Sequence, residues 1–354
     1  MHGATFLSTV ILCALCSICG GSSISEYVLV SQPHTGKVLV TEVDALSRTV
    51  LSGPRGLVTH GLRKPMGLAV DHRRQRLFVA DSERRKLFMY KLIYTDGEIA
   101  VDGRRHVAAS GITPRWVAVD EETGSVFCSD EVHSAVGEVL GEDIKKLSHA
   151  GGHTPKFHVL YSPDTTLAVD GPSGIAVDGF HLFWGNKAHG RRLGSVVSGL
   201  EDAHGRARDV PGTVTALSNN ADKVHGLCAS GSTVFYTGES RFVYSARKGS
   251  HGHDTRILIS NLDRPRGCAW DGDGTVYVAD EGGRAVLSFP SSSHNRGRLR
   301  ASKLFEVQGP YGIAVVRPPS SPSPATRHTV RSRSVVIGLP LVTICMATLA
   351  SLQL

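Results

Sequence analysis

The feature that most constrains this chain is a short pattern that returns six times. In residues 265–280, PRGCAWDGDGTVYVAD, proline opens an apolar run, an Asp/Gly turn follows, and a second apolar run ends on aspartate. Successive copies start 42 to 58 residues apart, the period of four-stranded propeller blades. Five full copies begin at Pro65, Pro114, Pro172, Lys223 and Pro265, and a half copy begins at Pro310.

Each full copy reads as an antiparallel hairpin, because two short β-rich runs flank a turn of Asp and Gly. A third run usually follows, such as Lys86 to Tyr90, and often a fourth, such as Arg256 to Ile259. No stretch of comparable length has helical apolar periodicity. The pattern therefore predicts four-stranded sheets with little helix.

The ends of the repeat region predict how the ring closes. The half copy supplies one strand before RPPSSPSP, which cannot continue a sheet. Three strand-like runs near the N-terminus, 26–30, 36–40 and 49–51, can complete that blade. Closure by both termini protects otherwise open sheet edges. We therefore expect an all-β fold, a six-bladed β-propeller over residues 24–316.

The repeated residues resemble the NHL repeat, whose copies look like P-x-G-I-A-V-D…L-Y-V-A-D. The resemblance covers most of Leu62 to Val316. The runs 127–130 (FCSD) and 183–186 (FWGN) are also similar to the YWTD repeat of lipoprotein-receptor propellers. Both resemblances imply the same six-bladed propeller.

Both ends of the chain resemble targeting segments. Residues 1–23 combine an uncharged apolar core with small residues, which is typical of a secretion signal peptide. Residues 317–334 form a Pro/Ser/Arg-rich linker, and 335–354 an apolar tail. Small residues, a polar spacer and an apolar tail favour a GPI attachment signal, with a transmembrane segment as the alternative. Either predicts a secretory-pathway protein on the extracellular face of the plasma membrane, held there through the tail.

The charge and the cysteines are less informative than they first look. Four of the seven net positive charges lie beyond the last repeat, which leaves an ordinary balance on the propeller and argues against a nucleic-acid partner.

Cys13, Cys16 and Cys19 lie in the predicted signal. The remaining cysteines of the predicted propeller, Cys128, Cys228 and Cys268, stand where small apolar residues are normal, so buried thiols are expected, and their odd number leaves at least one unpaired.

The recurring aspartates are predicted to stabilise turns and not to act in catalysis. A catalytic group is needed once, whereas a turn-forming Asp is needed in every blade. No catalytic residue and no metal ligand are predicted, since no known catalytic motif is present. The positions that vary near the start of each copy are more informative, because they should lie at one mouth of the central channel. These candidate ligand-binding residues are Met66, Arg115, Trp116, Ser173, His225, Arg266 and Tyr311.

Two functions remain open from the sequence. The first is a secreted or cell-surface, non-catalytic binding module without a cofactor, whose ligand is a protein, a peptide or a carbohydrate. The second is a propeller enzyme of the lactonase, gluconolactonase-like or peptide-amidating-lyase-like type. The resemblance to such propellers implies Ca or Zn in the central channel for the second function only.

Overall fold

The computed structural model describes residues 25–95, 97–147, 154–188, 193–201, 214–295 and 298–319. In this part the chain forms six four-stranded antiparallel sheets. Helix is confined there to α1 (Gly141–Lys146) and the 3-10 helix η1 (Ser291–Asn295). The predicted all-β, six-bladed propeller is confirmed.

The sheets are numbered as blades. Blade 1 contains β4 (Pro65–Asp71), β5 (Arg76–Asp81), β6 (Lys86–Thr95) and β7 (Glu98–Ser110); blade 2 contains β8 (Pro114–Val119), β9 (Val126–Asp130), β10 (Ala135–Val139) and β11 (His158–Tyr161). Blade 3 contains β12 (Pro172–Val177), β13 (His181–Asn186), β14 (Gly194–Leu200) and β15 (Thr215–Ala221); blade 4 contains β16 (Val224–Ser230), β17 (Thr233–Gly238), β18 (Val243–Arg247) and β19 (Thr255–Ile259). Blade 5 contains β20 (Pro265–Trp270), β21 (Thr275–Asp280), β22 (Ala285–Pro290) and β23 (Ser302–Glu306); blade 6 contains β24 (Ile313–Val316), β1 (Ser25–Gln32), β2 (Lys37–Asp44) and β3 (Val50–Val58).

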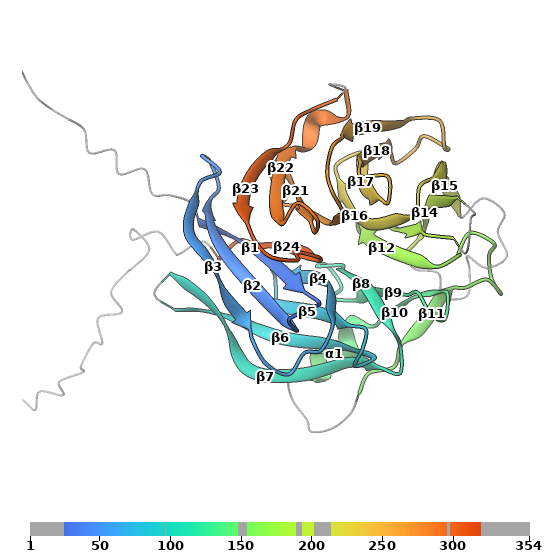
Figure 1. Ribbon diagram of the computed structural model, residues 1–354. Coiled ribbons are helices and arrows are strands. Elements are labelled where there is room, and N and C mark those ends of the chain that lie inside the picture. Colours follow the sequence, from blue (N-terminus) through green and yellow to red (C-terminus); the bar gives the residue numbers. More distant parts are fainter. Residues whose placement is uncertain are drawn as a thin grey trace, which may run out of the picture. The chain divides into compact units, whose positions relative to one another are not determined.

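The first strand of each blade lies at the centre of the ring. Figure 1 shows β24, β4, β8, β12 and β16 around a common middle, with β3, β7 and β19 towards the rim. Neighbouring inner strands contact one another in the order β24, β4, β8, β12, β16, β20 and back to β24. The starts of the repeats therefore meet at one mouth of a central channel.

Blade 6 joins the two ends of the propeller, as predicted. β24 pairs antiparallel with β1, with Tyr27 opposite Val316 and Val30 opposite Ile313. A buried charge network also fastens this blade to blade 5. Arg48 contacts Glu26 at 3.1 Å and Asp271 at 3.0 Å, and the Tyr277 hydroxyl donates to Glu26 at 2.5 Å. Strand pairing and ion pairs thus close the ring together.

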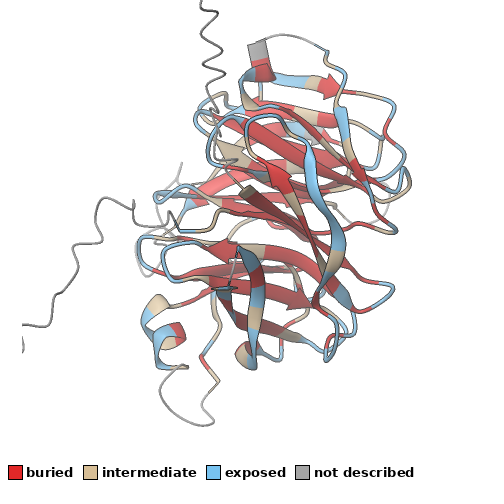
Figure 2. Ribbon diagram, turned by 90° about the vertical axis from the view of Figure 1, so that its left-hand side faces the viewer, coloured by how far each residue is buried: buried red, intermediate tan, exposed pale blue. Residues whose placement is uncertain are grey.

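The hydrophobic core is divided among the interfaces between neighbouring blades. Each sheet is covered on both faces, so strands such as β5 are buried at every position. One cluster, for example, joins Phe78 and Met89 of blade 1 to Cys128 and Val139 of blade 2. Figure 2 shows buried residues running along the strands and exposed residues in the connecting turns.

The recurring aspartates serve the backbone, as predicted. Asp71 and Asp271 accept backbone N–H groups of the turns that follow them. Asp81 and Asp280, at the ends of second strands, accept N–H groups from the loops that precede β4 and β20. These hydrogen bonds hold each blade to the connection that enters it.

The cysteine prediction was wrong in part. Cys128 is a free, buried thiol, whose pKa is raised by burial. Cys228 and Cys268, however, form a disulfide between β16 and β20, with their Cα atoms 5.7 Å apart. They lie on neighbouring inner strands, and that proximity is a property of the ring.

The predicted signal peptide, most of the linker and the apolar tail lie outside the described residues. In the part of the chain that the structure describes, no helix is long and apolar enough to span a membrane. The signal peptide and the anchor therefore stay predictions.

Candidate functional site

The structure brings five of the seven predicted mouth residues together. Arg115, Trp116, His225, Arg266 and Tyr311 are linked by the stacking, cation–π and hydrogen-bond contacts described below. The other two are fully packed. The Met66 side chain is buried in the same hydrophobic cluster as Trp116 and Tyr311, and the Ser173 hydroxyl donates to the carbonyls of neighbouring strands. Whether these residues bind a ligand stays a prediction.

Trp116 closes the central channel at this mouth. It stands where the other repeats have glycine, and its indole stacks on Tyr311 with ring centroids 5.5 Å apart. A Cβ built on Gly67 of β4, or on Gly267 of β20, would lie within 3.1 Å of the indole. Because β20 is opposite β8 in the ring, the indole crosses the axis. The missing side chains at Gly67 and Gly267 make room for it.

Below this plug the channel encloses a cavity of about 210 Å³. Its walls are mostly Val, Leu, Ile and Ala side chains of the inner strands. At the opposite mouth, His72 forms a 2.6 Å contact with Glu121, and Trp270 is 38% exposed. The two mouths therefore differ, because one is covered by aromatic rings and the other opens into this cavity.

A network of opposite charges covers the aromatic plug. The guanidinium groups of Arg115 and Arg266 lie 5.5 Å and 5.7 Å from the centre of the Tyr311 ring. Arg115 contacts Glu131 at 3.2 Å, and Lys187 contacts the same carboxylate at 2.8 Å. A depression of about 290 Å³ adjoins Arg115 and Glu131, and Val132 at its edge is 70% exposed.

On the other side of Tyr311, Arg266 is held by two partners. Its Nε donates to Glu281 at 2.8 Å, and its Nη1 donates to His225 Nε2 at 3.1 Å. Both arginine side chains are mostly buried, at 24% and 19% exposure. They are therefore ordered before any ligand arrives, which lowers the entropic cost of binding.

Burial and neighbouring cations shift two pKa values at the mouth. Burial, together with Arg115, lowers the pKa of Lys187 to about 8. Burial and the nearby Arg266 lower the pKa of His225 to about 3, so His225 is neutral at physiological pH. Its buried Nδ1 has no hydrogen-bond partner among the described residues, nor has the Trp116 Nε1 or the Tyr311 hydroxyl. Buried polar atoms normally have partners, so the mouth has unused hydrogen-bonding capacity.

The sequence reasoning missed Glu131, Lys187 and Glu281. Each follows directly the Asp or Asn that ends a second strand. The residue in that position varies from copy to copy, as at the start of the inner strand. The comparison of repeats that found Arg115 and Arg266 would therefore have found these three as well.

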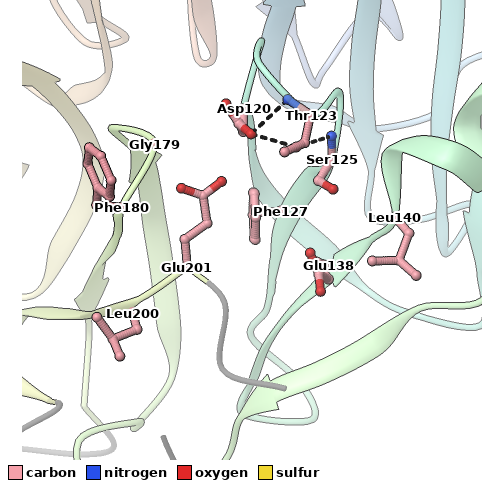
Figure 3. A pocket seen from close by; sticks show the side chains of 10 residues that line it. All are labelled: Asp120, Thr123, Ser125, Phe127, Glu138, Leu140, Gly179, Phe180, Leu200 and Glu201. Atoms are coloured by element: carbon pink, nitrogen blue, oxygen red, sulfur yellow. Dashed lines mark hydrogen bonds between the residues drawn. The ribbon is translucent and has the colours of Figure 1, made fainter. Parts of the chain in front are cut away.

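A second hollow lies between blades 2 and 3, with a volume of about 480 Å³. Phe127, Leu140, Phe180 and Leu200 contribute apolar surface to it. In Figure 3 the Glu201 carboxylate lies between the rings of Phe180 and Phe127. Burial, and next the charge of Asp120, raise the pKa of Glu201 to about 7. No pattern in the sequence indicated this hollow.

A Ser–His–Asp chain lies elsewhere, in blade 4 and η1. The Ser245 hydroxyl is 2.9 Å from His294 Nδ1, and His294 Nε2 is 2.9 Å from Asp254. Ser245 is completely buried and His294 is 3% exposed. A nucleophile must contact its substrate, and Ser245 is buried. These hydrogen bonds therefore hold η1 against blade 4 and do not form an accessible active site.

The sequence matches no protein-family model and no curated protein. Among solved structures, the fold is similar to a chain of a nidogen/laminin complex, with 15% identity, a TM-score of 0.61, and coverage of 82% of this chain and 98% of that one. TolB from Acinetobacter baumannii shows 10% identity, a TM-score of 0.55, and coverage of 83% and 67%. A gluconolactonase from Xanthomonas campestris shows 13% identity, a TM-score of 0.51, and coverage of 80% and 86%.

These likenesses establish the class of protein, a six-bladed β-propeller, and at such identities nothing finer. The structures include a chain from a complex of two proteins and a hydrolytic enzyme. Fold alone does not determine function. The NHL family assignment stays a prediction, and the function has to be argued from the site.

Proposed function

We propose that this protein is a non-catalytic binding module on the outside of the cell, and that it recognises an acidic segment of a protein ligand at its plugged channel mouth. The observation that carries the proposal is the charged layer over the Trp116–Tyr311 stack. Three cations, Arg115, Lys187 and Arg266, face two carboxylates there. A shallow, ordered and cationic surface suits recognition of an acidic side chain.

Apolar surface beside the charges also favours a protein ligand. Val132 is exposed at the edge of the adjoining depression, and Tyr311 and Trp116 form a rigid floor. Protein interfaces combine arginine and aromatic anchors with a polar rim. The mouth of this propeller has that combination.

The proposed location rests on the disulfide and on the predicted targeting segments. Disulfides persist in secreted and cell-surface proteins and are rare in the cytosol. The bond between Cys228 and Cys268 therefore supports passage through the secretory pathway. Attachment by a GPI anchor or by a spanning segment follows from the tail sequence, and from nothing else in the molecule.

The mouth residues do not fit the channel metal that the enzyme hypothesis implies. Of the possible donors, Ser173 donates to two backbone carbonyls and His225 Nε2 is bonded to Arg266. Three cationic side chains surround the same point, and they would repel Ca²⁺ or Zn²⁺. In the described residues no group of three or more His, Cys, Asp or Glu side chains could hold a metal ion.

Peptide selection tests the proposal. Random peptides displayed on phage would be selected on the wild-type protein and then measured on two double variants. Arg115→Gln with Arg266→Gln removes two permanent positive charges at the plugged mouth. The control, His72→Gln with Arg73→Gln, removes one permanent positive charge and one histidine at the opposite mouth. We expect the selected peptides to share Asp or Glu, and to bind the first variant about tenfold or more weakly and the control as well as wild type. Peptides without acidic residues, or equal binding to both variants, would contradict the proposal.

A further inference from the structure

A second charged surface lies between blades 1 and 2, away from the channel mouth. It is a groove of about 710 Å³ with blade 1 strands on one side and α1 on the other; Figure 1 shows α1 beside β6 and β7. Five permanent cations line it against two carboxylates, Asp102 and Glu142, and its lining residues include no Phe, Tyr or Trp. The cations are Arg74, Arg76, Lys91, Arg104 and Lys145.

The register of blade 1 explains why cations gather there. Phe78 and Met89 are cross-strand partners and pack in the core between the blades. Arg76 and Lys91 are also partners, two residues further along, so they continue the same face beyond the core. That face becomes cationic where the blades diverge.

A bulge adds a third strand to this cationic row. Tyr90 pairs with Arg105 and Leu92 with Val101, so Lys91 alone faces the three residues Asp102 to Arg104. The Asp102 carboxylate accepts the backbone N–H of Arg104 at 3.1 Å, which holds the bulge in shape. A bulge redirects side chains, and this one sets Arg104 beside Lys91.

Part of this charge is not neutralised within the protein. Arg76 is paired with the buried Asp71 at 2.6 Å, and Arg74 donates to two backbone carbonyls. Lys91 and Arg104 are exposed, and their side chains have no ion pair or hydrogen bond with any described residue. Like charges on adjacent strands destabilise a sheet, so a polyanion in the groove would remove a cost that the free protein carries.

We propose that this groove binds a linear sulfated polysaccharide. A groove between two blades admits a chain, whereas a flat bilayer surface cannot enter it. Single-stranded nucleic acid is bound through several aromatic side chains that stack on successive bases, whereas His106 is the one ring among the residues that line the groove. The choice of a polysaccharide also rests on the proposed extracellular location, because sulfated glycans are the polyanions of that compartment.

Heparin binding tests the proposal on the protein purified from eukaryotic secretory cells. The probe is a fluorescent heparin oligosaccharide, with the same oligosaccharide after desulfation as its reference. Lys91→Glu with Arg104→Glu changes the groove. Arg298→Glu with Arg300→Glu makes the same change of net charge at exposed positions that lie outside the groove. All four positions are exposed, and matching melting temperatures would confirm folding.

We expect the groove variant to bind heparin at least about tenfold more weakly, and the control variant to bind it like wild type. The slope of log Kd against log salt should become shallower by about two, one unit for each lost contact. Equal losses in both variants, or equal binding of the desulfated chain, would overturn the proposal. So would stronger binding to oligo-dT or to phosphatidylserine vesicles, each in favour of that ligand. The phage peptides report on the channel mouth separately, so failure of either proposal can be recognised.

Discussion

The disulfide between β16 and β20 allows a quantitative test of both the fold and the proposed compartment. The perturbation is Cys228→Ala with Cys268→Ala, compared with reduction of the wild-type protein. Both side chains are buried and small, at 6% and 7% exposure, so the double alanine variant leaves little empty space. The main effect is therefore loss of the covalent link.

The sequence separation sets the magnitude. The bond closes a loop with a separation of 40 residues. Cross-linking a loop of that length lowers the conformational entropy of the unfolded chain, which corresponds to about 4 kcal/mol at room temperature. For a domain of this size, we expect the melting temperature to fall by about 6 °C.

Thermal unfolding with and without dithiothreitol measures the effect, and thiol alkylation with mass spectrometry identifies the bond. In the unreduced, unfolded propeller only Cys128 should be alkylated; in the native protein it should be protected, because it is buried and its thiol pKa is raised. Alkylation of all three propeller cysteines without reductant would refute the bond. An unchanged melting temperature in dithiothreitol would refute the energetic reasoning.

Three further outcomes are expected. Deleting residues 24–45 should unfold the domain, since β24 would lose its partner β1; a soluble product that melts at the wild-type temperature would refute the composite blade. Glu201→Gln should stabilise the protein by about 1 kcal/mol at pH 8 and by nothing at pH 4. The raised carboxyl pKa gives wild type stability that is complete below pH ~4.5 and is lost as the pH rises through about 7, so equal curves for the two proteins would contradict it. A GPI anchor predicts release from cells by phosphatidylinositol-specific phospholipase C and loss of an epitope fused after Leu354, whereas a retained epitope and no release would favour a spanning segment.

The sheets could be predicted because their information is local and repeated. Each copy carries its own opening proline and its own turn aspartate, and the same pattern occurs often enough to fix the strand order. The composite blade could be predicted by counting strands. The half copy at Pro310 supplies one strand of a four-stranded blade, and the run at 26–30 can pair with it. The hairpins depend on neighbours in the sequence, and the composite blade depends only on counting the strands that the repeats leave over.

The disulfide, the hollow between blades 2 and 3 and the groove between blades 1 and 2 could not be predicted, because they depend on how neighbouring blades pack against each other. Cys228 stands two residues after its repeat glycine, Gly226, and Cys268 stands one after Gly267. Comparison of the repeats therefore gave no reason to pair them. The stagger of the inner strands brings them together: a Cβ on Gly226 would contact the Arg266 carbonyl and Gly267 Cα. The groove likewise depends on where blades 1 and 2 diverge.

Trp116 shows how one departure from the repeat can shape a candidate site, and Trp116→Gly tests this. Five other copies have glycine at that position, so the backbone tolerates the change. The indole, however, is 5% exposed and stacks on Tyr311. Loss of a buried aromatic ring costs about 3–5 kcal/mol, and guanidinium unfolding measures it. Trp270→Gly, at the opposite mouth and 38% exposed, should cost clearly less.

The same substitution should weaken binding at the mouth, because the aromatic floor fixes both guanidinium groups. Without the indole, Tyr311 loses its stacking partner, so the ring over which Arg115 and Arg266 lie is no longer held in place. We therefore expect the phage-selected acidic peptides to bind Trp116→Gly about as weakly as they bind the Arg115/Arg266 double variant, and to bind Trp270→Gly normally. A Trp116→Gly protein that melts like wild type would show that the indole does not plug the channel. A destabilised protein that keeps its peptide affinity would instead separate the plug from the site above it.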